Sequence, residues 1–273
     1  DKGTPSTPAK GAAAKNAAPA ASAGDLFVDE TKARGIDFVF ENGMTGKRYM
    51  PEQLGGGGAF FDADQDGDLD LLLINGGPLP GSEAPAPNAL YKNDGTGHFT
   101  QVTGAGGLEG GRDFGVGCAT ADVDLDGDLD VYITNWGPDR LYLNDGKGQF
   151  TDVTHESGIK DAAWSASAAF GDVTGDGLPD LYVTNYLLYD ITKHEPCFQR
   201  TVEIYCGPQP YRGAPDRLYA NRGGGKFEDV TATRFAQPTD GKGLAVAMSD
   251  VDHDGDLDIY VANDQTPNNM RQN

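Results

Sequence analysis

The fold is decided by a stretch in the middle of the chain, 122–130 (DVDLDGDLD), which runs directly into 131–135 (VYITN). The first part places aspartate at every second position around one glycine. The second part alternates, with Val131 and Ile133 on one face of a predicted strand and Tyr132 and Thr134 on the other. The stretch therefore predicts a tight acidic loop that leads into a β-strand.

The same pattern recurs along the chain. Acidic loops begin at Asp62, Asp122, Asp172 and Asp250, and a closing segment of the type Phe-Thr-Asp-Val-Thr recurs at 99–103, 150–154 and 227–231. Each unit is predicted to hold four short antiparallel strands, the last two joined by a Gly-rich turn. Four strands in a repeat of about 50–60 residues are typical of a β-propeller blade.

The repeats predict an all-β fold, a β-propeller of four-stranded antiparallel blades. Residues 1–24 are rich in Ala and Pro and predict a flexible tether, because such a segment buries too little apolar surface to fold. Residues 25–273 divide into blade units at about 50–108, 109–160, 161–235 and 236–273. An outer strand is also predicted at 27–31. About three and a half blades do not close a ring, so we expect further blades in a longer protein or in a partner chain.

The acidic loops are predicted to bind calcium. Ca²⁺ prefers six to eight oxygen ligands, and carboxylates at alternate positions of a bent loop converge on one point. Counting from the first aspartate, we expect side-chain ligands at positions one, three, five and nine and the backbone carbonyl at position seven, whose side chain faces solvent. The candidate ligands are Asp62, Asp64, Asp66, Asp68, Asp70; Asp122, Asp124, Asp126, Asp128, Asp130; Asp172, Thr174, Asp176, Leu178, Asp180; and Asp250, Asp252, Asp254, Asp256, Asp258.

Two other structures could account for acidic loops of this type. An EF-hand needs Glu at position twelve, and here that position holds Leu73, Ile133, Val183 and Val261. Ordinary solvated turns are also rich in Asp and Gly, but four such loops in register with a strand repeat favour metal sites. We expect three to four Ca²⁺ ions, with the third loop weakest because Thr174 offers a neutral oxygen.

The net charge of -21 among 273 residues argues against nucleic acid as a partner, because phosphate binding needs clustered Lys and Arg. No apolar stretch is long enough for a transmembrane segment. Cys197 and Cys206 lie in an insertion, about 187–214, and a disulfide is favoured over a metal site. The insertion also carries several aromatic residues and is a second candidate for binding.

The repeat resembles the FG-GAP/VCBS repeat family, whose relatives include integrin α-subunit propellers. Pro51-Glu52 before Gly55–Asp62, Cys206-Gly207-Pro208 and 216–219 (DRLY) resemble the bacterial cartilage-acidic-protein-like branch, which often ends in an ASPIC/UnbV domain. The resemblance covers about residues 25–273. It implies a seven-bladed propeller, calcium between the first and second strands of a blade, and an exported protein. No ASPIC/UnbV segment is present in this sequence.

Function is expected on the face opposite the calcium loops, where the second strands end. The candidates there are Asn75, Asn135, Trp136, Asn185, Tyr186, Asn263 and Asp264. Aromatic and amide side chains at converging loop tips suit a protein or glycan ligand. The alternative for the asparagines is that they cap strand ends. We expect a non-catalytic binding or assembly module located outside the cell, in the periplasm or on the cell surface. The alternative function is a subunit or fragment of a larger extracellular enzyme or redox complex.

Overall fold

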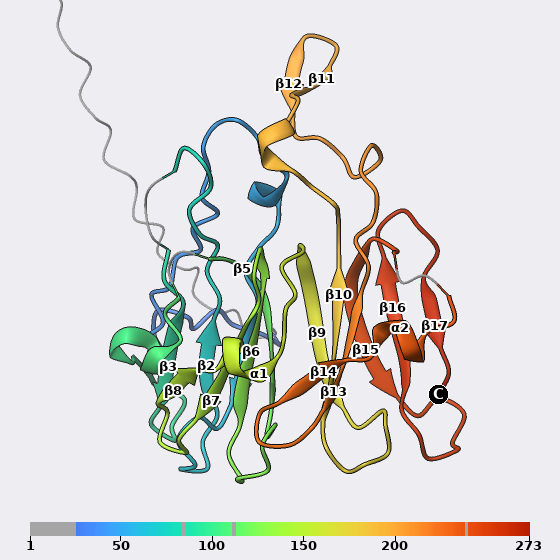
Figure 1. Ribbon diagram of the computed structural model, residues 1–273. Coiled ribbons are helices and arrows are strands. Elements are labelled where there is room, and N and C mark those ends of the chain that lie inside the picture. The colour runs from blue at the N-terminus through green and yellow to red at the C-terminus, as the bar shows by residue number, and fades with distance from the viewer. Residues whose placement is uncertain (1–25, 83–85, 111–112, 238–239) are drawn as a thin grey trace, which may run out of the picture.

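The computed structural model of the protein describes residues 26–82, 86–110, 113–237 and 240–273 (Figure 1). The predicted tether, 1–24, lies outside these residues. The fold is all-β apart from short helical turns, and its main elements are four antiparallel sheets, which we call blades one to four. Their strands, in spatial order, are β1(Gly58–Phe61), β2(Asp70–Leu73), β3(Ala89–Asn93), β4(Phe99–Gln101); β5(Phe114–Ala121), β6(Asp130–Trp136), β7(Arg140–Asn144), β8(Phe150–Asp152); β9(Ser165–Gly171), β10(Asp180–Asn185), β13(Arg217–Asn221), β14(Phe227–Asp229); and β15(Gly243–Ser249), β16(Asp258–Asn263), β17(Asn269–Arg271).

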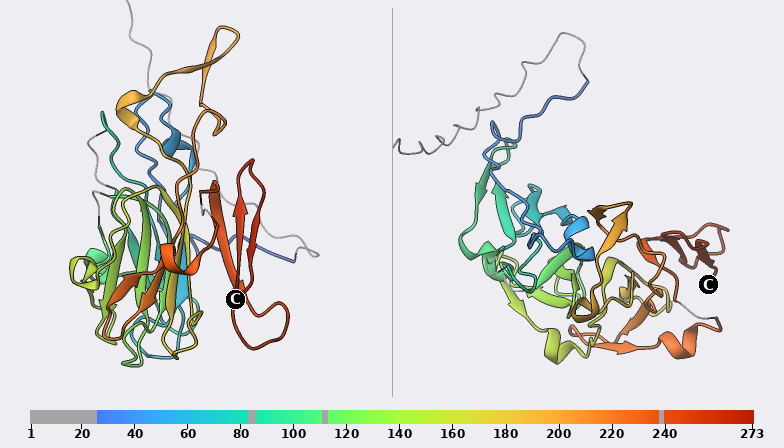
Figure 2. Two further views of the ribbon diagram at one scale, coloured as in Figure 1. Left: turned by 45° about the vertical axis from the view of Figure 1, so that its right-hand side comes forward. Right: turned by 90° about the horizontal axis from the view of Figure 1, so that it is seen from above.

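The blades stand side by side, as in a β-propeller. Seen from above they follow an arc, which Figure 2 shows in its right-hand view. The first strands β1, β5, β9 and β15 contact one another in series. Small residues allow this approach: a Cβ atom on Gly57 would lie 2.8 Å from the Cα of Gly117 in the next blade. The predicted all-β propeller of four-stranded blades is therefore confirmed, with three blades of four strands and a fourth of three.

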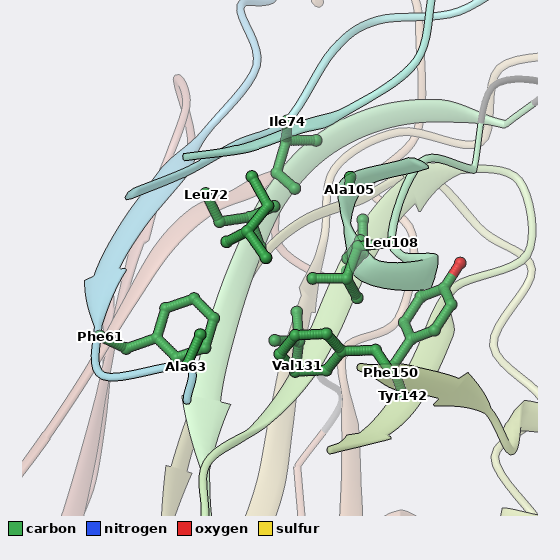
Figure 3. Close-up of a cluster of buried hydrophobic side chains, with 11 residues drawn as sticks. Phe61, Ala63, Leu72, Ile74, Ala105, Leu108, Val131, Tyr142 and Phe150 are labelled. Carbon is green, nitrogen blue, oxygen red and sulfur yellow. The ribbon is translucent and has the colours of Figure 1, made fainter. Parts of the chain in front are cut away.

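The hydrophobic core lies between the blades. Phe61, Leu72 and Ile74 of blade one pack against Val131, Tyr142 and Phe150 of blade two (Figure 3). Tyr132, on the other face of β6, joins the cluster between blades two and three. The alternation predicted for 131–135 is thus present, but both faces of the strand are buried, because every inner blade has a neighbour on each side.

The N-terminal segment differs from its prediction. The structure has no strand at 27–31, and Leu26 and Phe27 are more than nine-tenths exposed. The following turn does repeat: Gly35 and Gly158 share a φ of 88° and lie against the outer-strand carbonyls of Phe99 and Phe227, respectively. The sequence similarity between the N-terminal segment and the blade units therefore corresponds to a shared turn, but not to a shared strand.

The insertion rises above blade three as the hairpin β11(Cys197–Gln199) and β12(Val202–Ile204) (Figure 1). The remaining elements are short helical turns: η1(Met50–Gln53), η2(Thr103–Gly107), α1(Thr154–Ser157), η3(Ile191–Lys193) and α2(Thr231–Arg234). Within the described ranges, no helix is both long and apolar enough to cross a membrane.

The core between the blades makes a quantitative prediction. Leu72 has no exposed surface, so Leu72→Ala leaves a cavity and should lower the free energy of unfolding by about 2–5 kcal/mol. Val202 is 64% exposed on the hairpin, and Val202→Ala should change that free energy by less than about 0.5 kcal/mol. Urea unfolding followed by circular dichroism measures both. Equal effects of the two substitutions would contradict the placement of the core.

Candidate metal centres and the opposite face

The acidic loops join the first and second strands of each blade and lie together at the lower end of the molecule in Figure 1. In every loop the carboxylate at position one accepts hydrogen bonds from the backbone N–H groups of positions five and six, at distances of 2.8–3.2 Å. These bonds close the loop into a ring of about six residues around its first side chain. The acidic residues thus stabilise the conformation of the loop and also give it a negative charge.

The bend of each loop depends on two positions with positive φ. Glycine at position six has φ between 85° and 101°. Position four also has positive φ, held by Gln65 (59°), Leu125 (63°), His253 (65°) and Gly175 (74°). Such a backbone costs of order 1 kcal/mol for a residue with a Cβ atom, and strain of this kind clusters at functional sites. The bend at position six is evident from its glycine in the sequence, whereas position four carries no common residue type that would reveal its positive φ.

The carboxylate at position nine connects the loop to the rest of its blade. Asp70, Asp130, Asp180 and Asp258 are at most 2% exposed. One oxygen of each accepts from the backbone N–H of position two, and the other accepts from an asparagine N–H at or just after the end of the third strand, at 2.8–3.1 Å. Burial is the main cause that raises the pKa of Asp130, to about 7.

Position three carries the clearest sign of a ligand. Asp64 Oδ1, Asp124 Oδ1 and Thr174 Oγ1 are buried and have no hydrogen-bond partner in the protein. Buried polar atoms are rarely left unpaired, and such exceptions often mark a water or an ion. The same atom position is thus unpaired in three of the four loops, the degenerate third loop included.

Three loops gather enough oxygen atoms for a cation. In the described part of the chain, the ligand atoms of each of three groups lie within 4.8 Å of one another: Asp62, Asp64, Asp66; Asp122, Asp124, Asp130; and Asp250, Asp252, Asp254. The third loop offers no such group, because Thr174 replaces the aspartate at position three. The first two of these groups also contain the buried unpaired oxygen at position three. Such a set of carboxylate oxygens suits a hard divalent cation of the Ca²⁺ type.

One predicted feature of the loops is wrong. The position-seven side chain was expected to face solvent, and in blade two the Asp128 side chain is 5% exposed with Oδ1 unpaired. The hairpin turn after β7 covers it, since a Cβ atom on Gly146 would lie 3.2 Å from Asp128 Oδ2. Burial, and then the neighbouring carboxylates, raise the pKa of Asp128 to about 6. Asp256 is exposed, as expected, and Asp68 is half-buried.

The first loop already contains a cation of the protein itself. The Lys92 ammonium, on β3, contacts Asp64 Oδ2 and lies 3.1 Å from Asp66 Oδ2. The other blades carry Leu143, Ala220 and Gln272 at the equivalent place before the strand-end asparagine. The contact raises the pKa of Lys92, mainly through its hydrogen bonds to the two carboxylates. A metal ion entering this loop must compete with the ammonium group.

The loops also join neighbouring blades. The side-chain amides of Asn144, Asn221 and Asn273 donate to the position-two carbonyls of the preceding blade, Ala63, Val123 and Val173, at 2.8–2.9 Å. The backbone N–H groups of the same asparagines bond the position-nine aspartate of their own blade. Each of these asparagines therefore links two adjacent acidic loops.

At the opposite face, the strand-end asparagines are structural. Asn75, Asn135 and Asn185 are buried, and together with Asn263 their amides donate to proline carbonyls of the loop that leads into the third strand. Their backbone N–H groups donate to the side chain that follows each proline, which is Asn88, Asp139, Asp216 or Asn268. These amide and backbone groups therefore hold the strand-end turns, which favours the capping alternative. That the asparagines contact a ligand stays a prediction, and Asn263 Oδ1 is left without a hydrogen-bond partner in the protein.

The aromatic candidates behave differently from one another. Tyr186 is buried, and its hydroxyl donates to Asp264 Oδ2 at 2.7 Å, which links blades three and four. Trp136 is half-buried and lines a cavity of about 500 Å³ together with Trp164 and Tyr189. Sequence reasoning missed Trp164, since it lies in the segment before β9 and outside the strand-end pattern.

The insertion is fixed to the body of the protein. A disulfide joins Cys197 to Cys206, as predicted. Tyr205 donates to the buried carboxylate of Glu52 at 2.8 Å, and the Lys242 ammonium donates to the carbonyl of Pro208 at 2.6 Å. The insertion is thus an ordered cap over one end of blades two and three.

The fold and the loops define a β-propeller repeat protein with acidic loops between the first two strands of its blades. The chain belongs to the FG-GAP-like repeat family, whose model matches residues 62–133, 122–183 and 201–261. It is similar to cartilage acidic protein 1 of Xenopus tropicalis (27% identity over 185 residues) and of Homo sapiens (27% over 189), in each case over 66% of this chain and 25% of the relative. The chain thus spans about a quarter of the length of these relatives.

Among solved structures, a lectin of Agrocybe aegerita that recognises non-reducing terminal N-acetylglucosamine is similar at 16% identity and a TM-score of 0.36. The match covers 77% of this chain and 50% of the lectin.

The contact of Lys92 with the first loop predicts the effect of removing it. Lys92→Leu places the residue of blade two in blade one, and the affinity of the first loop for Ca²⁺ should rise about fivefold, because an exposed ion pair contributes up to about 1 kcal/mol. Calorimetric titration with CaCl₂ measures the change. Lys193→Leu, which removes an exposed ammonium from the insertion at the opposite face, is the control and should leave the affinities unchanged. An unchanged or lower affinity in Lys92→Leu would contradict competition.

The third loop should be the weakest site, because it lacks one carboxylate. Thr174→Asp supplies that carboxylate and should raise the affinity of this loop about tenfold, whereas Thr174→Val removes the buried oxygen and should abolish binding there. The same titration, read as the number of sites and their dissociation constants, checks both variants. Equal affinity at all four loops of the unchanged protein would overturn this ranking.

Proposed function

We propose that the chain is an exported, calcium-binding propeller module that engages a ligand on the face opposite the acidic loops and is not itself catalytic. The observation that carries the calcium proposal is the buried, unpaired oxygen at position three of three loops. Four equivalent loops that use their carboxylates to hold backbone N–H groups support a structural metal site. Acid–base catalysis needs two carboxyl groups whose pKa values are pushed apart, whereas carboxylates gathered around one cation would all be held ionised.

Calcium would act through residues already tied to the fold. The carboxylates at positions one, three, five and nine would hold the ion together with the position-seven carbonyl. Without a cation these charges repel one another at short range. Because the strand-end asparagines link adjacent loops, neutralising one loop stabilises the contact with the next blade. The expected result is a stiff scaffold that holds the opposite face in one arrangement.

The opposite face supports the binding half of the proposal. The insertion caps it through a disulfide and a buried ion–carbonyl contact, and an open cavity lined by aromatic side chains lies beneath the insertion. Aromatic side chains in a concave, rigid site provide most of the affinity in many interfaces. A ligand carried by a protein or a glycan in the extracellular space would fit this arrangement.

Calcium binding is tested by calorimetry and by unfolding of the same sample. We expect three to four ions per chain, and each site should stabilise the fold by about 2.7 kcal/mol at a free Ca²⁺ concentration one hundred times its dissociation constant. Chelation should lower the unfolding midpoint, and Mg²⁺ should not replace Ca²⁺, because it demands a smaller octahedral site.

Two variants locate the ions. Asp124→Asn keeps the size of a position-three ligand and should remove one ion while the other loops still bind. Glu156→Gln neutralises an exposed carboxylate outside the loops and should leave the ion count unchanged. If the unchanged protein binds no calcium, or if both variants lose the same amount, the acidic loops are plain turns and the proposal fails.

A further inference from the structure

The cavity beneath the insertion lies between the ends of blades two and three. Its walls come from three segments: Trp136 and Gly137 after β6, residues 162–164 before β9, and residues 187–190 at the start of the insertion. Backbone hydrogen bonds hold the three together, from Gly137 N–H to Ala163 O at 3.0 Å and from Tyr186 N–H to Trp164 O at 2.8 Å. The site is therefore built before any ligand arrives.

Three aromatic rings surround this cavity. The Tyr189 ring is inclined by 52° to Trp136 and by 56° to Trp164, with centroid distances of 6.5 and 5.8 Å. Trp136 and Tyr189 are partly exposed, and Trp164 is 2% exposed. Rings inclined to one another form a concave aromatic site and not a flat platform for stacking.

The charge of the cavity is one-sided. Asp190 is the only charged residue among those that line it. Its Oδ2 pairs with Lys193 at 2.9 Å, and its Oδ1 accepts from the backbone N–H and the hydroxyl of Thr192. The Lys193 side chain is 81% exposed and that of Asp190 47%, and an exposed ion pair of this kind contributes little. The whole chain carries a net charge of -21. The site therefore favours a cation over an anion.

Polar atoms in the lining are few. Besides Asp190, the lining side chains offer only the Trp136 indole N–H and the Tyr189 hydroxyl, since the Trp164 indole N–H is buried. The Tyr189 hydroxyl is already hydrogen-bonded to His194 Nδ1 at 3.0 Å. A sugar ring needs several hydrogen-bond partners for its hydroxyl groups, whereas a methylated ammonium needs ring faces and a nearby carboxylate.

We propose that this cavity binds a trimethylammonium group, with the methyl groups against Trp136 and Tyr189, the buried Trp164 ring behind them, and the charge balanced by Asp190. The proposal rests on the proposed function, since it names the chemistry of the ligand at the same face. Two sources share this chemistry, a trimethyl-lysine side chain of a protein and a phosphocholine headgroup.

The test uses the fluorescence of the protein itself. The chain has two tryptophans, Trp136 and Trp164, and both line the cavity, so a change in tryptophan emission reports on this site. The calcium-loaded chain is titrated with tetramethylammonium chloride at constant ionic strength, and separately with the uncharged isostere 3,3-dimethylbutan-1-ol. We expect saturable binding of the cation at least about tenfold tighter than that of the isostere.

Variants assign the charge. Asp190→Asn, at an exposed position, should weaken binding of the cation about threefold to tenfold and leave the isostere unaffected. Lys193→Ala removes the competing ammonium and should strengthen binding of the cation. Glu156→Gln is the distant control. Equal affinity for cation and isostere, or no effect of Asp190→Asn, would overturn the proposal, as would preferential binding of N-acetylglucosamine or methyl glucoside.

Further titrations separate the outcomes. Tighter binding of Nε-trimethyl-lysine than of phosphocholine assigns a protein ligand, and the reverse assigns a headgroup; failure of both to bind would overturn the proposal. Calcium binding is measured by calorimetry on the same sample. Calcium binding without ammonium binding refutes this inference alone, whereas ammonium binding without calcium binding refutes the calcium scaffold and leaves the site in place.

Discussion

The buried aspartate at position nine of each acidic loop is the interaction on which the blades depend. These aspartates are at most 2% exposed, and burying a carboxylate is costly in free energy unless its oxygens are hydrogen-bonded. Here one oxygen receives the N–H of position two and the other the N–H of the strand-end asparagine, and such bonds to an ionised group are stronger than neutral ones. One side chain thus fixes the loop, the start of the second strand and the end of the third strand together.

The same asparagine carries the constraint to the neighbouring blade. Its backbone serves its own loop and its side chain serves the loop of the preceding blade, so loop geometry and blade packing cannot change independently. The hydrophobic contacts between blades supply most of the stabilisation, but they are non-directional. The hydrogen bonds at the acidic end select one angle between blades, and the arc seen in Figure 2 follows from repeating that angle.

The period of the strands, the four loops and the disulfide could be predicted from the sequence, because each depends on residues close together in the chain. Three features depend on pairing across strands and could not. Lys92 enters the first loop because β3 pairs with β2, and Asp128 is buried because a hairpin turn lies over it. The turn-holding role of the asparagines at the opposite face is not evident from residue type alone, because an amide looks the same whether a ligand or a proline carbonyl uses it. A signal was present: in each unit a proline followed by Asp or Asn precedes the third strand.

The acidic end of the molecule and the opposite end differ in which polar groups are left unpaired, because their hydrogen bonds are arranged differently. At the acidic end the backbone N–H groups converge on side chains, which fixes the loops and leaves oxygens over for a cation. At the other end the amides and carboxylates are consumed within the strand-end turns, as in the bonds of Asn185 to Asp161 and Pro215. Apart from Asp190, the accessible side chains in the cavity there are apolar or aromatic. The bond from Tyr186 to Asp264 ties this surface to the next blade. The walls of the cavity contain almost no hydrogen-bonding side chains of their own. Their arrangement therefore depends on the rigid blades that the loops hold together.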